Sequence, residues 1–261
     1  MAVTVSVLGS GSRGNTTFIK TSTTRILIDA GLSRREIAKR LTAIGEDPNG
    51  IDAVLITHEH NDHAAGLKTL VKDLQIQVFL TAGTLREIRA EEFERNGSTL
   101  TPVSDGVTFR VGNAEITPFA VPHDAAEPVA FSIHSEGVRV TQLTDIGHMP
   151  ESVAEHLKDS NILILESNHD LEMLRVGPYP WSLKQRLMGR FGHLSNTGVA
   201  QFIREQFDGT ASCLMLAHLS EKNNHPAVAR QESLKAMREC GHKTSVTLTS
   251  QQEPTSPIEI S

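Results

Sequence analysis

A short apolar run that ends in a cluster of histidines constrains this chain more than any other feature. The run AVLIT (53–57) has the length and composition of a buried β-strand, and HEHNDH (58–63) follows it directly. Apolar residues at helical spacing begin after Asp62, so the cluster lies between a predicted strand and a predicted helix. Imidazole and carboxylate groups this close together suit Zn, Fe or Mn, and four of them indicate more than one ion. The candidate ligands are His58, His60, Asp62 and His63.

Three further polar residues follow apolar runs elsewhere in the chain. His123 comes after AEITPFAVP, Asp145 after VRVTQLT and His218 after CLMLA. Strand ends are where distant segments complete a metal site, although each residue alone is equally well explained as a polar residue at a strand end. With these three the candidate set numbers seven, which is enough for two ions that each keep a position open for water.

The glycine-rich stretch GSGSRG (9–14) has the spacing of a dinucleotide-binding turn, and Asp29 stands twenty residues after its first glycine. Such a turn requires a helix to begin at its third glycine. The residues that follow are instead Thr-rich and β-branched, which indicates two strands joined by a turn. We therefore expect no nucleotide cofactor. We expect a tight loop near the metal ligands, where Ser12, Gly14 and Asn15 meet a substrate phosphate.

The chain has 261 residues, 38% of them hydrophobic, and a net charge of −6, which is the composition of a globular protein. It contains no apolar stretch of membrane-spanning length and no signal-peptide pattern, so we expect a cytoplasmic location without membrane contact. Strands and helices alternate without a low-complexity linker. We expect one domain over 1–250, with helices over 82–97 and 181–207, and a flexible tail over 251–261.

The seven candidate ligands resemble the metal-binding residues of the metallo-β-lactamase fold, because HxHxDH and the later residues match in order and approximate spacing. The resemblance covers nearly the whole chain and implies an α/β fold, a four-layer αββα sandwich with two metal ions at one edge. Its implied ligands are His58, His60 and His123 for one ion, Asp62, His63 and His218 for the other, and Asp145 as a bridge. Asp29 corresponds to an aspartate that orients a ligand histidine, so Asp29 and Asp62 join the predicted catalytic set.

Two departures separate the chain from other branches of this fold. Lactamases carry a cysteine ligand where Asp145 stands, and flavin di-iron proteins carry a glutamate where His60 stands. Both branches are therefore disfavoured, and phosphodiesterase-type branches remain.

Two later segments resemble nucleases of the ribonuclease Z type. They are ESNHD (166–170) and GHLSNTGVAQFI (192–203). The resemblance implies that His193 donates a proton to the leaving oxygen and that Glu166 orients or polarises it, with His169 as a rival donor. A polar residue near a helix start is the alternative explanation of His193.

The motifs GSGSRGN, LIDAGLS, THEHNDH, TDIGH, LESNHD, YPWSLKQR, GHLSN and AHLSEKNN together resemble the YycJ-type branch, also called WalJ or VicX. That branch implies a 5′ to 3′ exonuclease that acts on double-stranded DNA and is linked to mismatch repair. Two bound ions would supply the nucleophile, so no serine or cysteine nucleophile is expected. They would also add positive charge to an acidic chain that has to accept a polyanion.

Basic side chains precede His193 in the sequence. Lys184, Arg186 and Arg190 follow the aromatic residues Tyr179 and Trp181, a combination that suits a phosphate backbone and a stacked base. An ordinary amphipathic surface helix explains the same pattern equally well.

Three functions therefore remain open at the level of sequence. The favoured one is a dinuclear DNA exonuclease, and the second is a phosphodiesterase for RNA or a small phosphodiester. The third is a metal-binding accessory or regulatory protein of a signalling pathway. The sequence leaves open which of Zn, Mn and Fe is bound, and the oligomeric state.

Overall fold

The structure is a computed structural model, and it describes residues 2–88 and 99–261. By its internal contacts the chain divides into two compact units, where the sequence predicted one domain. The first unit comprises residues 1–120, 125–138 and 250–261, and the second comprises 121–124 and 139–249.

The first unit contains a seven-stranded sheet in the order β14-β1-β2-β3-β4-β5-β6. Strands β14, β1, β2 and β3 pair antiparallel, and β3 to β6 pair parallel. The strands are β1 (Val3–Gly9), β2 (Thr16–Lys20), β3 (Arg25–Ile28), β4 (Ala53–Leu55), β5 (Gln77–Thr81), β6 (Thr99–Val103) and β14 (Ile258–Ile260).

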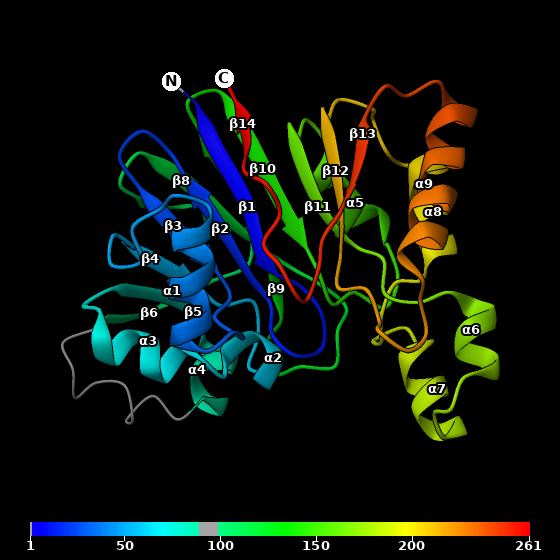
Figure 1. Cartoon of the computed structure of the whole chain (residues 1–261), viewed down its shortest axis with the longest axis horizontal. Helices are drawn as coiled ribbons and strands as arrows, with labels where there is room; N and C mark the ends of the chain where they lie inside the picture. The colour runs from blue at the N-terminus through cyan, green and yellow to red at the C-terminus, as the bar shows by residue number, and fades with distance from the viewer. Residues whose placement is uncertain (1, 89–98) are drawn as a thin grey trace. The chain divides into compact units, whose positions relative to one another are not determined.

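The C-terminal residues differ from their sequence-based expectation. The segment 251–261 was expected to be a flexible tail, but its last residues form β14, which adds an edge strand beside β1 (Figure 1). In this antiparallel pairing Val5 lies opposite Ile258. The backbone N–H of Thr255, just before β14, donates to the carbonyl of Val7. The apolar, β-branched residues of the short IEI segment suit an edge strand.

Helices of the first unit pack on the sheet through buried aliphatic side chains. Ser33 caps α1 by accepting from the N–H of Glu36, and the Ser-x-x-Glu sequence here is the pattern of a capping box. The helix predicted after Asp62 is divided at Gly66, where a Cβ would lie 1.9 Å from the Leu32 carbonyl oxygen. The helices are α1 (Arg34–Ala43), α2 (Asn61–Ala64), α3 (Leu67–Asp73) and α4 (Ala82–Glu87). The predicted helix over 82–97 extends into 89–98, which lie outside the described residues.

Three antiparallel strands complete the first unit. They are β7 (Phe109–Val111), β8 (Ala114–Ala120) and β9 (Val129–Ser135). The ring of Phe109 on β7 stacks on that of Phe79 on β5, with centroids 4.6 Å apart. Two β-layers therefore pack together within this unit.

The second unit is built on four parallel strands in the order β10-β11-β12-β13. Their largely buried apolar runs are typical of parallel strands covered on both faces. The strands are β10 (Val138–Leu143), β11 (Ile162–Glu166), β12 (Cys213–Ala217) and β13 (Ser245–Leu248). The helices are α5 (Glu151–Leu157), α6 (Leu171–Val176), α7 (Trp181–Leu187), α8 (Asn196–Glu205) and α9 (Pro226–Cys240), with α8 and α9 side by side in Figure 1.

The prediction of one long helical region over 181–207 is wrong. Two helices, α7 and α8, are separated there by a loop over 188–195. Gly192 turns this loop back onto the end of α7, because a Cβ at that position would lie 2.3 Å from the Arg186 and Leu187 carbonyl oxygens. His193 therefore lies in a loop between helices. Within the described ranges, 2–88 and 99–261, the structure has no helix that is both long and apolar enough to cross a bilayer.

Candidate metal centre

The histidine cluster of the first unit follows β4 and continues into α2. Its imidazoles lie close together, because the ring centroid of His58 is 4.2 Å from that of His63 and 4.6 Å from that of His60. His58 and His63 are buried, and the side chains of His60 and Asp62 are partly exposed. Local sequence alone thus brings four potential ligands to one turn.

A buried carboxylate orients one of these imidazoles. Nδ1 of His63 is 2.8 Å from Oδ2 of Asp29, and both side chains are fully buried. Thr57 fixes the carboxylate in turn, since its N–H and hydroxyl both donate to Oδ1 of Asp29 at 2.9 Å. With Nδ1 committed to Asp29, His63 offers Nε2 as its ligand atom.

The glycine-rich loop (9–14) packs against the turn that carries His58 to His63, so it lies beside the candidate ligands of this unit. The backbone N–H of Asn15 donates to the Asp62 carbonyl at 2.7 Å, and its Nδ2 lies 3.0 Å from Nε2 of His63. Gly31 allows the close approach, because a Cβ there would lie 1.7 Å from the Asp62 oxygen. Asn15 is buried, so it positions Asp62 and His63, whereas Ser12 is exposed.

Three candidate ligands of the second unit lie at the ends of their strands. Asp145 and His218, after β10 and β12, have φ angles of 60° and 54° in the left-handed region, as Asp29 does at 62°. Residues other than glycine adopt this conformation at a cost, and such positions concentrate at functional sites. Nδ1 of His123 lies 3.2 Å from the Gly192 carbonyl, and its Nε2 is 3.9 Å from Oδ1 of Asp145.

Glu166, at the end of β11, organises this group. It is fully buried, and its Oε1 accepts from Nδ1 of His193 at 2.7 Å and from Nδ1 of His218 at 2.9 Å. Its Oε2 accepts the backbone N–H groups of Ile146 and Leu194. Burial would raise the pKa of Glu166, but the charge of His193 and the hydrogen bonds from both histidines lower it to about 2. The ionised carboxylate therefore ties the proposed proton donor to a candidate metal ligand.

The two rival proton donors have different environments. Burial would lower the pKa of His193, but the charge of Glu166 and the hydrogen bond to it more than offset this, so the pKa is raised. Burial lowers the pKa of His169 to about 4, which leaves that side chain neutral at neutral pH. His193 is thus the better placed to carry a proton. A potential ligand atom from each of Asp145, Glu166, His193 and His218 lies within 4.8 Å of the others.

A buried amide network behind this group was missed by the sequence analysis. The side chains of Asn196 and Asn224 form two reciprocal hydrogen bonds of 2.9 Å. Nδ2 of Asn224 also lies 2.8 Å from the Ser167 carbonyl, and Nδ2 of Asn168 donates to the His218 carbonyl. The network joins the segments that carry Glu166, His193 and His218. The only sequence signal was the amide-rich composition of LESNHD, GHLSN and SEKNN at the ends of apolar runs.

The three basic residues that were predicted to contact a phosphate backbone differ in burial and in their partners. Lys184 is buried, and its Nζ donates to the Arg175 carbonyl at 2.7 Å, so it holds α7 against α6. Arg186 is 61% exposed and pairs with Asp124 at 2.5 Å. Nη2 of Arg190 lies 3.3 Å from Nε2 of His148, whose Nδ1 donates to the Arg190 carbonyl. Arg186 and Arg190 thus lie at the surface with side-chain partners, whereas Lys184 is buried and does not face a substrate.

Comparison with known proteins identifies relatives of the chain. Residues 24–219 match the family model described as the beta-lactamase superfamily domain. The exodeoxyribonuclease YycJ of Bacillus anthracis is 33% identical over 92% of this chain and 91% of its own length. The exodeoxyribonuclease WalJ of Streptococcus pneumoniae is 34% identical over 84% of this chain and 82% of its own.

Solved structures confirm the fold. The metallo-β-lactamase fold protein YhfI of Bacillus subtilis has a TM-score of 0.75, with 17% identity over 98% of this chain and 99% of its own. A diphosphatase of the PhnP family has a TM-score of 0.71, with 18% identity over 100% of this chain and 98% of its own. The predicted mixed α/β fold with two sheets is therefore confirmed. The chain is a hydrolase that belongs to the metallo-β-lactamase superfamily and, within it, to the family of its YycJ and WalJ relatives.

Proposed function

We propose that the protein is a divalent-metal-dependent phosphodiester hydrolase that degrades DNA from its 5′ end. The observation that carries the proposal is the shared carboxylate of Glu166, which holds His193 and His218 at 2.7 and 2.9 Å. This carboxylate joins the proposed proton donor His193 to His218, a candidate imidazole ligand. A proton donor and a metal ligand are the two kinds of group that metal-assisted hydrolysis uses. The exodeoxyribonuclease names of the relatives that are 33% and 34% identical support DNA as the substrate.

The donor set fits divalent cations of intermediate softness. Imidazole nitrogens and carboxylate oxygens suit Zn, Mn or Fe. From their order along the chain, the proposed ligands of two such ions are His58, His60, Asp62, His63, His123, Asp145 and His218. When bound, the ions supply an activated water and neutralise charge that develops on the phosphate.

The chain's own residues perform the remaining steps. Asp29 fixes the orientation of His63, and Glu166 fixes that of His218. His193 holds a proton, because Glu166 raises its pKa, and transfers it to the leaving oxygen as the P–O bond breaks. Arg186 and Arg190 contact the phosphates of the strand.

The biological setting is part of the same proposal. A 5′ to 3′ exonuclease in the cytoplasm that removes DNA during repair is consistent with the relatives' activity. The net charge of −6 disfavours sequence-independent coating of nucleic acid, so binding is proposed to be confined to the site and its arginines.

A substrate panel tests the proposal. Protein loaded in turn with Zn, Mn and Fe is incubated with 5′-labelled duplex DNA, single-stranded DNA, RNA and bis-p-nitrophenyl phosphate. We expect progressive release of mononucleotides from 5′ DNA ends, and its loss in His60→Ala. Cleavage of RNA alone would overturn the choice of DNA. Absence of any hydrolysis, with Asp145→Ala still functional in cells, would favour an accessory protein instead.

A further inference from the structure

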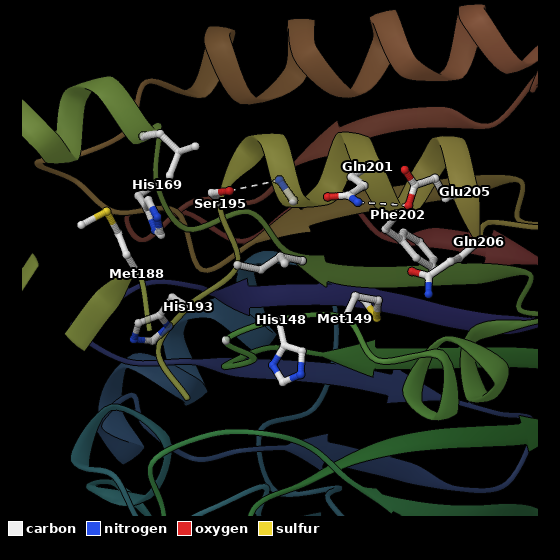
Figure 2. Close-up of a pocket in the computed structure, with 14 residues that line it drawn as sticks. His148, Met149, His169, Met188, His193, Ser195, Gln201, Phe202, Glu205 and Gln206 are labelled. Carbon is white, nitrogen blue, oxygen red and sulfur yellow. Dashed lines mark hydrogen bonds between the residues drawn. The ribbon is translucent and has the colours of Figure 1, made fainter. Parts of the chain in front are cut away.

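A pocket of about 290 Å³ lies beside His193 within the second unit. Figure 2 shows His193, His169 and Met188 at one end of it, and Gln201, Glu205 and Gln206 along the exposed side of α8 at the other (Figure 2). His148 and Met149, from the loop between β10 and α5, lie between these ends.

The position of His193 determines which part of a substrate reaches the pocket. Its Nδ1 is bound to Glu166, so Nε2, on the other side of the ring, delivers the proton. The group that carries the leaving oxygen has to lie next to His193 when the P–O bond breaks. Because His193 forms part of the pocket lining, that group is the one that enters.

Besides the proposed proton donor His193, the lining offers few groups that would hold a phosphate. No lysine or arginine is among the residues that line the pocket, and Glu205 contributes a carboxylate. Nε2 of Gln201 donates to that carboxylate at 3.0 Å, so Glu205 is held in place. Arg190 contacts His148 but does not itself line the pocket. An uncharged part of a nucleotide fits this lining, with its phosphate outside at Arg190.

The size and walls of the pocket suit one nucleoside. Its volume is near the lower end of small-ligand pockets, roughly 300–1,000 Å³, which leaves no room for a longer stretch of strand. Met149 and Met188 supply flexible, polarisable walls that accept rings of different shape. Phe202 adds an aromatic surface.

From these observations we propose that the pocket binds the terminal nucleoside, whose 3′ oxygen is the leaving oxygen. This inference rests on the proposed function and adds the reason why single nucleotides are released. Water oxygen bonds to phosphorus, the bond from phosphorus to the 3′ oxygen breaks, and His193 supplies the proton to that oxygen. The two methionines lead us to expect little discrimination between purine and pyrimidine.

Filling the pocket tests the inference. Gln201 is an exposed residue of α8, so Gln201→Trp obstructs the pocket without changing the buried core. The matched control is Arg204→Trp, on the same helix but outside the lining, which loses only an exposed ion pair with Glu239. Mononucleotide release from 5′-labelled duplex DNA is measured for both, together with inhibition by added deoxynucleoside 5′-monophosphate and hydrolysis of bis-p-nitrophenyl phosphate.

We expect Gln201→Trp to lower kcat/KM on DNA at least about tenfold and to weaken inhibition by the monophosphate similarly. Hydrolysis of bis-p-nitrophenyl phosphate should fall less, because p-nitrophenolate is smaller than a nucleoside and leaves without a proton. Arg204→Trp should match the wild type in all three. DNA cleavage and product inhibition unchanged in Gln201→Trp would overturn the pocket assignment while leaving the nuclease intact. A wild-type protein that cleaves no DNA would overturn the proposed function and, with it, this inference.

Discussion

The two groups of candidate ligands are built in different ways. In the first unit, four candidate ligands come from six consecutive residues, and the carboxylate of Asp29 orients one of them, His63. In the second unit, His123, Asp145 and His218 are far apart in sequence, and Glu166 with a buried amide network holds the segments together. The first group is therefore specified by a local motif, whereas in the second the positions of Asp145 and His218 depend on the register of parallel strands. Substitutions behind the second group should affect both catalysis and stability.

The largest expected effect concerns the proton donor, which belongs to the second group alone. His193→Ala should lower kcat on DNA by about 10²- to 10⁴-fold, the usual contribution of a general acid. The kcat on bis-p-nitrophenyl phosphate should fall much less, because p-nitrophenolate leaves without a proton. Metal content, measured by elemental analysis, should stay at the wild-type value. Equal losses on both substrates would contradict the role of His193 as a donor.

The two supporting carboxylates give a direct comparison between the groups. Asp29→Asn and Glu166→Gln should each lower activity by about 10- to 100-fold, as loss of a group that orients a ligand does. Only Glu166→Gln should also change the dependence of kcat on the leaving-group pKa, because of these two carboxylates it is Glu166 that hydrogen-bonds His193. Rates on a series of aryl phosphodiesters measure this. The same leaving-group dependence in both variants would refute the distinction.

The amide network predicts a stability difference. Asn224→Ala should lower the free energy of unfolding by about 2 kcal/mol or more, since it leaves the Ser167 carbonyl without its donor and Nδ2 of the buried Asn196 without its acceptor. Denaturant unfolding measures it, with the exposed Asn49→Ala as the control, expected to change by less than about 0.5 kcal/mol. Equal stabilities of the two variants would show that the network is not a structural support.

The smallest effects separate two of the basic residues. Arg190→Ala should raise KM several-fold and reduce the slope of log(kcat/KM) against log[salt] by about 1, because one phosphate contact is lost. Lys184→Met should leave that slope unchanged and lower stability instead, because its Nζ is bonded to the Arg175 carbonyl. A reduced slope in Lys184→Met would support the contact between Lys184 and a phosphate that the sequence predicted.

Local sequence was sufficient for the first group and for most strands, because HEHNDH, the apolar runs and the capping box at Ser33 are short-range patterns. It failed where long-range contacts decide. The loop at 188–195 interrupts a helical pattern because Gly192 packs on the end of α7, and Gly189 and Gly192 were the available signals. β14 forms only because β1 offers an edge. The pairing of Asn196 with Asn224 joins residues 28 positions apart.

The proposed nuclease reaction needs two divalent ions, and each of the two groups supplies candidate ligands for them. Metal-free protein is titrated with Mn or Zn while bound ions per chain and mononucleotide release from 5′-labelled duplex DNA are followed together. We predict no release without metal and full release when two ions are bound, with His60→Ala and His218→Ala each failing to reach it. Full activity of the metal-free protein, or of either variant, would contradict the account.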